Sequence, residues 1–200
     1  MTEAKRSLEA QHETEVNFCV KDIRSMISSN GVTRSTLSEV KARLLELATH
    51  QELFNTDIFP VQNGDNESSL YLLSEDVNHE YAFYALSEIR GKMTPPHDHT
   101  TWAVIAGIEG EELNKFYDRL DNGKDEGQAQ IRESHSEVVG DGTGVILMPE
   151  DIHSIHCLVE QPTLNFHFYG RSIEYLPKRK AFNMAEGTYK HFPANPHIYK

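Results

Sequence analysis

Two kinds of hydrophobic periodicity divide the chain into a shorter first part and a longer second part. Up to about residue 50, apolar residues recur every three to four positions, which is typical of one face of an amphipathic helix. From residue 70 onward, short β-prone runs alternate with segments rich in glycine, proline, asparagine and aspartate, which is typical of strands joined by turns. The pattern therefore predicts a helical segment followed by a mainly β domain.

The first part is predicted to form two helices, over about 8–29 and 35–49. Their apolar stripes consist of Val16, Cys19, Val20, Ile23 and Ile27 in the first helix and Leu37, Val40, Leu44 and Leu47 in the second. Gly31 is expected to end the first helix, and a hydroxyl of the segment STLSE (35–39) is expected to cap the second, with Glu39 in its first turn. Because Cys19 lies on the apolar stripe, we interpret it as a small core residue.

The second part contains about eight short β-prone runs. They are LYLLSE (70–75), YAFYALSEI (81–89), TTWAVIAGI (100–108), ELNKFYDRL (112–120), QAQIRESHSEVV (128–139), GVILMP (144–149), SIHCLV (154–159) and TLNFHFYG (163–170). Strands of this length and spacing indicate an antiparallel sandwich or barrel, with a jelly-roll barrel among the options. We expect one domain over 1–200, with helices to about 55, a barrel over about 70–170 and an irregular tail over 171–200 that wraps the barrel.

Composition and charge narrow the kinds of partner. The 200 residues carry a formal net charge of −12, which argues against a nucleic-acid binder or an anionic-membrane binder. The two cysteines have no CxxC spacing, which favours a reduced intracellular protein over a disulfide scaffold. The sequence shows neither a signal-peptide core nor an apolar run of about 20 residues. We therefore expect a cytoplasmic protein, and its oligomeric state stays open.

Three histidines are candidates for a metal site. His97 and His99 are one residue apart, so on a strand both side chains leave the same face. His153 follows a proline turn at the start of a later run, where an antiparallel hairpin can bring it opposite the pair. Three imidazoles on one side of a barrel would leave about three positions open on an octahedral ion. The alternatives are two exposed histidines at a strand end, or His156 in place of His153 as the third ligand.

The run TLNFHFYG alternates strictly between polar and apolar residues. Asn165, His167 and Tyr169 share one face, and Leu164, Phe166 and Phe168 share the other. If the polar face points outward, it is an ordinary solvated surface. If it points inward, its members must satisfy one another by hydrogen bonding, and a tyrosine at the end of such a row could orient a substrate.

These pieces together resemble the thiol dioxygenases of the cupin superfamily, which include cysteine dioxygenase and bacterial 3-mercaptopropionate dioxygenases. The resemblance covers about 70–170 and is carried by HDHT (97–100), Gly110, MPEDIH (148–153) and NFHFYG (165–170). Many cupins have a glutamate three or four residues after the HxH pair, where this chain has Ala103 and Val104, as in three-histidine thiol dioxygenases. The resemblance implies a mainly β cupin double-stranded β-helix, a jelly-roll barrel, with an N-terminal α-helical segment.

The resemblance also implies roles for individual residues. The ligands of a non-heme Fe(II) would be His97, His99 and His153. The catalytic pair would be Tyr169 and His167, and Asn165 would replace the serine of the family's Ser-His-Tyr row beside the substrate. Neither cysteine lies near Val104, where some family members join a cysteine to the tyrosine, so no such crosslink is expected. Cys157 is expected to fill the core.

The group that would bind a substrate carboxylate is less clearly defined. Cysteine dioxygenases carry an arginine on an early strand, which corresponds here to 70–73 and contains no basic residue. Enzymes of the mercaptopropionate type use an arginine after the tyrosine. Of Arg171, Lys178 and Arg179, Arg179 best suits a bidentate carboxylate contact. Arg90 and Lys92 are further candidates, and PKRK (177–180) could also be merely a solvated loop.

The function implied by the resemblance is an iron(II)-dependent dioxygenase. It would oxidise a small thiol carboxylate, such as 3-mercaptopropionate or cysteine, to a sulfinate with O₂. One alternative is a cupin dioxygenase that cleaves a C–C bond of a sulfur-free substrate, because a fold does not specify the chemistry. The other is a non-catalytic metal-binding or sensor cupin.

Overall fold

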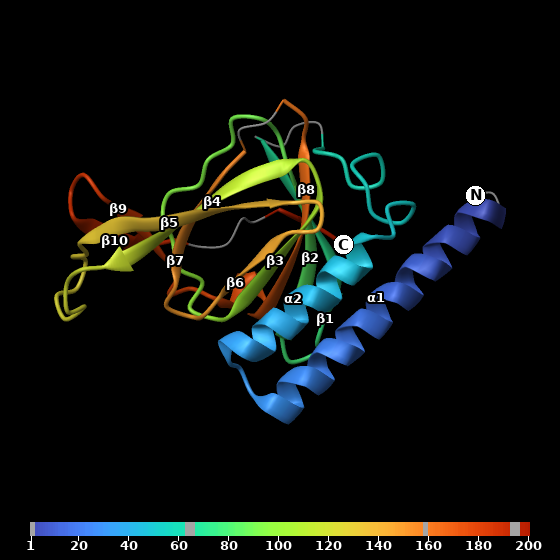
Figure 1. The fold of residues 1–200 in the computed structure, drawn as a ribbon, viewed down its shortest axis with the longest axis horizontal. Helices are drawn as coiled ribbons and strands as arrows, with labels where there is room; N and C mark the ends of the chain where they lie inside the picture. The colour runs from blue at the N-terminus through green and yellow to red at the C-terminus, as the bar shows by residue number, and fades with distance from the viewer. Residues whose placement is uncertain (1–2, 63–66, 158–159, 193–196) are drawn as a thin grey trace.

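Two N-terminal helices pack along one side of a β body (Figure 1). The computed structural model describes residues 3–62, 67–157, 160–192 and 197–200. Helix α1 spans Glu3–Asn30 and α2 spans Arg34–Ala48, so both predicted helices are confirmed, although α1 begins about five residues earlier than expected. Gly31 follows α1 with a φ of +70° and donates its N–H to the Ile27 carbonyl. The cap of α2 is Thr33, whose hydroxyl accepts the N–H of Thr36, rather than a hydroxyl of 35–39.

The strands form three sheets. In chain order they are β1 Ser68–Glu75, β2 Glu80–Glu88, β3 Ala103–Glu109, β4 Glu111–Arg119, β5 Ile131–Gly140, β6 Gly144–Leu147, β7 Ile152–His156, β8 Thr163–Arg171, β9 Lys180–Asn183, β10 Thr188–His191 and β11 Ile198–Tyr199. The first sheet has the order β11-β1-β2-β8-β3-β6, the second β5-β4-β7 and the third β10-β9. All eight predicted runs correspond to strands β1 to β8.

The two larger sheets enclose the interior of the barrel, and the helices cover the outer face of the six-stranded sheet. One core cluster joins the helices to that outer face, for example through Leu44, Val104 and Phe166. A second cluster joins the inner face to the three-stranded sheet, for example through Ile105 and Phe116. The fold is therefore the expected mainly β double-stranded β-helix, a jelly-roll barrel, with an N-terminal helical segment.

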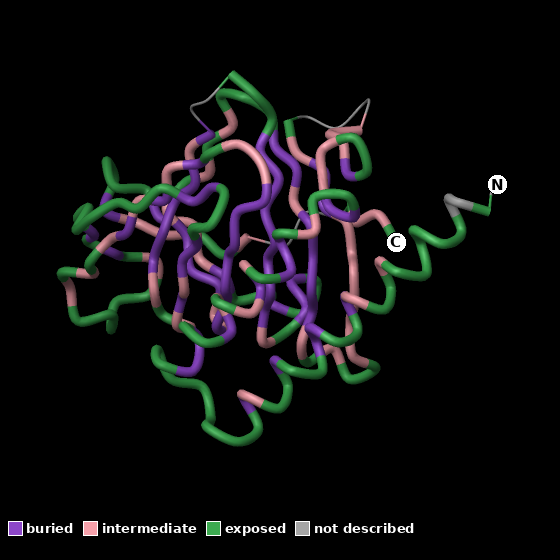
Figure 2. The backbone as a smooth tube through the Cα atoms, turned by 45° about the vertical axis from the view of Figure 1, so that its right-hand side comes forward, coloured by how far each residue is buried: buried purple, intermediate pink, exposed green. Residues whose placement is uncertain are grey.

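Strand β8 shows why the helices matter for the site. Its apolar residues Leu164, Phe166 and Phe168 belong to the core shared with α1 and α2. Because successive side chains of a strand point to opposite faces, Asn165, His167 and Tyr169 point into the barrel. All three are buried, and Figure 2 shows buried backbone running through the strands while the helices expose an outer face. The polar face of TLNFHFYG therefore points inward.

The chain after residue 171 differs from the irregular tail that we expected. It contains a short 3₁₀-helix, Ile173–Tyr175, and the strands β9, β10 and β11. Strand β11 extends the six-stranded sheet by pairing in parallel with β1, so backbone pairing orders this part of the chain. The predicted strand at 154–159 is shorter than expected, since β7 ends at His156, and Leu158 and Val159 lie outside the described residues.

A tight turn at Gly110 joins β3 to β4. Gly110 has a φ of +70°, which favours glycine, and a Cβ at this position would lie 2.7 Å from the Pro162 carbonyl oxygen. The turn brings β4 directly after β3 and so places its residues in the second sheet.

Among the described residues, neither helix combines the length and apolar character that a membrane crossing requires.

Candidate metal centre

His97 and His99 lie just before β3, in an extended segment rather than in a strand. His97 forms an isolated antiparallel bridge with His153 of β7. The N–H of each residue donates to the carbonyl of the other, at 2.8 Å and 3.0 Å. Backbone pairing therefore brings the third histidine opposite the HxH pair, although the two segments are more than 50 residues apart in the chain.

The three histidine side chains form one buried group. One ligand nitrogen from each of His97, His99 and His153 lies within 4.8 Å of the others. The Nε2 atoms of His99 and His153 are 2.9 Å apart, and two nitrogens bound at about 2.1 Å and a right angle to one ion would be about 3.0 Å apart. The exposed fractions are 5%, 3% and 0%. The group therefore fits a transition-metal ion of borderline softness.

His156 lies outside this group. Its Nε2 is 2.8 Å from the Ser154 hydroxyl, and its side chain is partly exposed. Successive residues of β7 point to opposite faces, so His153 and His156 diverge. The structure therefore brings together His97, His99 and His153 and leaves out the alternative third ligand.

Two of the three rings are oriented by hydrogen bonds from Nδ1. His97 Nδ1 donates to the Pro95 carbonyl at 3.0 Å, and His153 Nδ1 lies 2.9 Å from Asn114 Oδ1. Both contacts leave Nε2 available to an ion, as in most histidine ligands of proteins. His99 Nδ1 is buried and has no hydrogen-bond partner among the described residues.

Burial keeps the three imidazoles neutral. It lowers the pKa of His97 to about 4, and the nearby charge of Arg179 lowers it further. Burial is also the main reason why the pKa values of His99 and His153 are well below the usual range. Because a metal binds the neutral imidazole, these ligands need not lose a proton when an ion binds.

His167 and Tyr169 form a hydrogen-bonded pair beside the histidines. Tyr169 Oη is 3.1 Å from His167 Nδ1, and the rings of Tyr169 and His99 are 5.1 Å apart, centroid to centroid. Burial raises the pKa of Tyr169 above its usual value and lowers the pKa of His167 to about 3. Both side chains are therefore neutral, and the phenol keeps a proton that it can donate.

Among the described residues, Asn165 is not hydrogen-bonded to His167. The predicted row of three polar residues is therefore interrupted between Asn165 and His167. The amide Nδ2 of Asn165 donates instead to Glu112 Oε2 at 2.8 Å. Asn165 Oδ1 and His167 Nε2 are both buried without a partner in the described part of the chain. The predicted contact of Asn165 with a substrate stays a prediction.

Arg179 reaches the histidine group from the segment after β8. It is 8% exposed, its Nε has no partner among the described residues, and its guanidinium lies 4.2 Å from the ring centroid of Phe192. The neighbouring Lys180 is tied to the HxH segment, because its N–H donates to Asp98 Oδ1 at 2.9 Å. Asp98, the residue between the two histidines, thereby ties the residue next to Arg179 to the segment that carries His97 and His99.

The other basic candidates lie elsewhere. Arg171 and Lys178 are exposed, Arg90 pairs with Glu160, and Lys92 lies 3.2 Å from Glu67. Arg179 is therefore the candidate that the structure brings to the histidines.

Three polar residues of the site escaped the sequence reasoning: Asp98, Glu112 and Asn114. Strand β4 buries Glu112, Asn114 and Phe116, while the alternating Leu113 and Lys115 are only partly buried. From hydropathy alone, Leu113 would be expected to point into the interior, and Glu112 and Asn114 toward solvent. The available signal was the alternation of Glu112, Asn114 and Phe116 directly after the Gly110 turn. The sequence alone, however, provided no reason to expect that the carboxyl group of Glu112 points inward.

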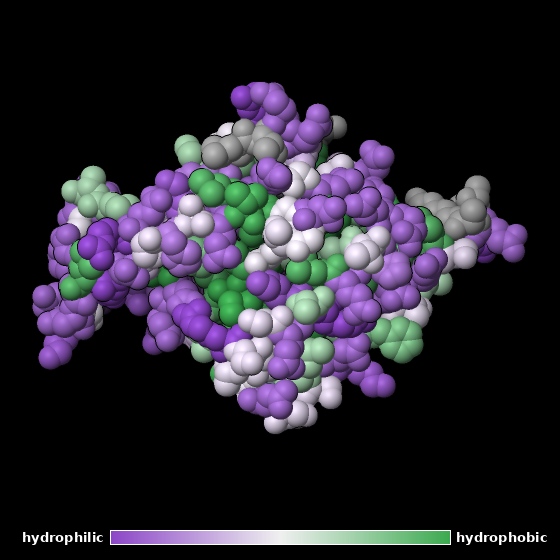
Figure 3. Space-filling view, viewed as in Figure 1, coloured by the Kyte–Doolittle hydropathy of each residue, from purple (hydrophilic) through white to green (hydrophobic). Residues whose placement is uncertain are grey.

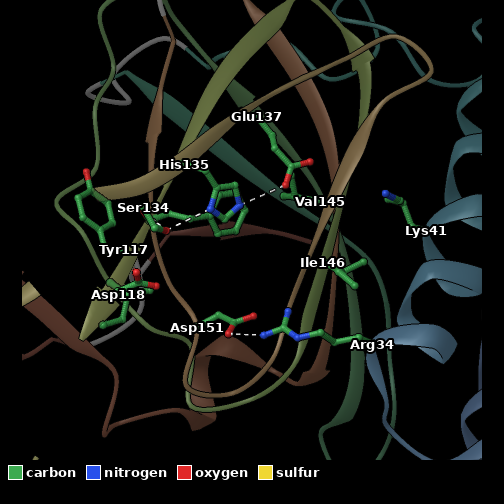
Figure 4. A pocket seen from close by; sticks show the side chains of 12 residues that line it. Arg34, Lys41, Tyr117, Asp118, Ser134, His135, Glu137, Val145, Ile146 and Asp151 are labelled. Atoms are coloured by element: carbon green, nitrogen blue, oxygen red, sulfur yellow. Dashed lines mark hydrogen bonds and ion pairs between the residues drawn. The ribbon is translucent and has the colours of Figure 1, made fainter. Parts of the chain in front are cut away.

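A cavity of about 300 Å³ lies between α2 and the strands (Figure 4). Hydrophobic residues gather near the centre of this face, beside α2 (Figure 3). Figure 4 shows His135 between Ser134 and Glu137. Its Nδ1 is 3.1 Å from the Ser134 hydroxyl, and its Nε2 is 3.5 Å from Glu137 Oε1. These side chains are exposed, so water competes for their hydrogen bonds, and we assign no chemistry to them.

The comparisons with known proteins give fold relatives only. No family model matches the chain, and no curated protein sequence matches it. A structure of oxalate oxidase in complex with the substrate analogue glycolate is similar at 18% identity over 60% of this chain and 59% of that chain, with a TM-score of 0.43. KdgF from Halomonas sp. is similar at 12% identity over 60% of this chain and 94% of that chain, also with a TM-score of 0.43.

A third similar structure is a Klebsiella pneumoniae protein with a double-stranded β-helix domain. It shares 15% identity over 62% of this chain and 87% of that chain, with a TM-score of 0.43. This chain thus spans less than two thirds of the oxalate oxidase chain that it matches. In the part of the chain that the structure describes, His97, His99 and His153 form a buried group that could hold a metal ion.

Proposed function

We propose that the protein is an iron(II)-dependent thiol dioxygenase. The reaction joins a thiolate and O₂ to form a sulfinate, RS⁻ + O₂ → RSO₂⁻, with both oxygen atoms transferred to sulfur. The observation that carries the proposal is a buried arginine, Arg179, beside three neutral imidazoles, with an Nε that has no partner in the described part of the chain. Such an arrangement suits a small substrate with a metal-binding group at one end and a carboxylate at the other.

The residues present fit Fe(II) in donor type and in number. Three neutral nitrogen ligands leave the 2+ charge of the ion uncompensated, which favours an anionic ligand such as a thiolate. Bound iron would supply a centre at which the sulfur and O₂ can react. The protein contributes the rest by holding the substrate in a dry pocket close to that centre.

Arg179 is the proposed carboxylate-binding residue. Its guanidinium can bind a carboxylate in bidentate geometry, and its burial makes such a contact stronger than at the surface. A thiol with a nearby carboxylate, such as 3-mercaptopropionate or cysteine, would satisfy both Arg179 and the metal.

Tyr169 is the proposed proton donor to the substrate or to oxygen. When His167 Nδ1–H donates to the phenol oxygen, the Tyr169 O–H is free to donate to a third group. The raised pKa of Tyr169 keeps this proton in place at neutral pH. Asn165 lies on the same strand face, and its Oδ1 has no partner within the described ranges, so it is proposed to line the substrate pocket.

The test is O₂ consumption by protein loaded with Fe(II) in the absence of air. We expect uptake with 3-mercaptopropionate, cysteine or a related thiol carboxylate, and one sulfinate formed for each O₂ consumed. A matched thiol without the carboxylate should need a much higher concentration. Uptake with a sulfur-free diketone alone would support the C–C-cleaving alternative. Bound zinc without turnover would support a sensor or structural role.

A further inference from the structure

A chain of buried hydrogen bonds leads from the third histidine into the opposite end of the barrel. His153 Nδ1 contacts Asn114 Oδ1 at 2.9 Å, and Asn114 Nδ2 donates to Glu112 Oε1 at 2.9 Å. The other oxygen of Glu112 accepts from Asn165 Nδ2 at 2.8 Å. All four side chains are at most 1% exposed. Three strands, β7, β4 and β8, are thus joined through one carboxyl group.

The chemistry of this chain determines which way the Asn114 amide faces. The NH₂ group of Asn114 faces Glu112, because Asn114 Nδ2 donates to Glu112 Oε1 at 2.9 Å. The carbonyl oxygen of Asn114 then faces His153 and can only accept. His153 must therefore carry its proton on Nδ1, which leaves the Nε2 lone pair 2.9 Å from His99 Nε2, inside the metal site.

We propose that Glu112 and Asn114 are positioning residues that hold His153 in its metal-binding tautomer and orientation. Glu112 acts through Asn114 and touches neither the ion nor the substrate. The inference concerns metal binding and rests on the histidine group being the metal site, whatever the substrate is. Outer hydrogen bonds of this kind also increase the basicity of a ligand imidazole.

Glu112 also belongs to a cluster with Glu88 and Cys157 whose ligand atoms lie within 4.8 Å of one another. We do not interpret this cluster as a second ion site, because its donors and acceptors already satisfy one another. Both oxygens of Glu112 accept amide N–H groups, and the Cys157 thiol donates to Glu88 Oε2 at 3.3 Å. Glu112 is instead held in position by Asn114 and Asn165, whose amide groups donate to its two oxygens.

The arrangement predicts different results from two substitutions of Glu112. In Glu112→Gln the new side-chain oxygen can still accept from Asn114. Its new NH₂ group can donate to Asn165, whose amide is free to turn over because Oδ1 has no partner among the described residues. In Glu112→Leu neither contact exists, and the Asn114 amide loses the group that orients it.

The first experiment needs no metal and no substitution. Long-range ¹H–¹⁵N correlation spectra of the metal-free protein report which ring nitrogen of each histidine carries the proton. We expect His153 to be protonated at Nδ1 in the wild type and in Glu112→Gln. Glu112→Leu and Asn114→Leu should shift His153 toward the other tautomer or toward a mixture. A wild-type His153 protonated at Nε2 would overturn the proposal even if every variant failed to fold.

The second experiment measures the affinity for Zn²⁺ by competition with a chelator, which does not depend on activity. Asn114→Leu and Glu112→Leu should bind Zn²⁺ about 10–100-fold more weakly, as is usual when an outer partner of a ligand is lost. Glu112→Gln should stay close to the wild type. Folded leucine variants with wild-type affinity would refute the positioning role, whereas normal Zn²⁺ binding without thiol oxidation would refute only the proposed function.

Discussion

The interior of the barrel contains two buried clusters of ionisable side chains with opposite character. The histidine cluster comprises His97, His99 and His153, and the carboxyl cluster comprises Glu88, Glu112 and Cys157. Both are almost inaccessible to solvent, and each has three potential ligand atoms within 4.8 Å of one another. By composition and burial alone, either cluster could be taken for a metal site.

Hydrogen bonding separates them. Around the histidine cluster, buried atoms of His99, His167 and Arg179 have no partner in the described part of the chain. In the carboxyl cluster, both oxygens of Glu112 and one of Glu88 accept hydrogen bonds from neighbours. Because an unsatisfied buried polar group is costly, unpartnered atoms indicate where an external ligand is needed. The comparison therefore favours the first cluster as the place for an external ligand, because these oxygens of the second already accept hydrogen bonds from neighbours.

The largest effect should come from removing a ligand. His153→Ala should weaken metal binding by at least about a hundredfold, since one ligand of a protein metal site contributes on the order of 3 kcal/mol. His156→Ala is the matched control, because that ring lies outside the cluster and should leave the affinity unchanged. Chelator competition measures both. Equal losses in the two variants would contradict the assignment of the third ligand.

The next effect should come from Arg179, whose Nε has no hydrogen-bond partner among the described residues. Arg179→Met should raise KM for a thiol carboxylate by about 10–150-fold, because a hydrogen bond to a charged group contributes about 1.5–3 kcal/mol. Metal affinity should change little, since Arg179 is not a ligand. Arg179→Lys keeps the charge but loses the bidentate contact, so its KM should be intermediate. An unchanged KM in the methionine variant would exclude Arg179 as the carboxylate-binding residue.

A smaller effect is expected at Tyr169. Tyr169→Phe removes one O–H group and should lower kcat by about 2–12-fold, as expected for the loss of one neutral hydrogen bond of about 0.5–1.5 kcal/mol. KM and metal content should stay near the wild-type values. Steady-state O₂ uptake together with metal analysis separates these quantities. A loss of bound metal in this variant would instead indicate a structural role.

The last prediction concerns the pH dependence of stability without metal. Burial and the charge of Glu88 raise the pKa of Glu112 from 4.5 to about 8. The stabilising contribution of protonated Glu112 is thus complete below about pH 4.5 and is lost as the pH rises through about 8. Relative to Glu112→Gln, which has no charge to bury, the wild type should lose stability over this window. Each 1 kcal/mol lost lowers Tm by about 2–4 °C.

Melting curves of the metal-free wild type and Glu112→Gln, recorded from pH 4.5 to 8, measure this difference. Glu88→Gln serves as a second control. Because burial also raises the pKa of Glu88, the wild type should likewise lose stability relative to this variant as the pH rises. If the two melting temperatures ran parallel across the window, Glu112 would be ionised throughout, and its burial would have to be compensated by another group.

Local patterns were sufficient for most of the fold. The helical stripes of α1 and α2 and the eight main strands were all predicted from spacing and turn residues. The tail was missed because β9, β10 and β11 are only two to four residues long. Strands this short show too little periodicity to detect. A pairing between distant parts of the chain, such as that of β11 with β1, also leaves no local pattern in the sequence.

The site was predictable where the sequence itself carries the geometry. The HxH spacing and the Asn-His-Tyr alternation identify residues that share a face, because side-chain direction along an extended chain alternates with a period of two. Local spacing does not predict which residues from distant parts of the chain come together. That His153 and Arg179 meet the HxH pair depends on the His97–His153 bridge and on Asp98 holding Lys180, contacts between segments more than 50 residues apart.

The inward direction of the polar faces depended on tertiary packing for the same reason. The β8 pattern specifies two faces but not which one points inward, and α1 and α2 resolve this by covering the apolar face. In β4, burial of Glu112 and Asn114 contradicts simple hydropathy, and it is tolerated because Asn165 and His153 complete their hydrogen bonds. Periodicity along the chain thus defined the candidates, whereas contacts between distant strands decided which of them form the site.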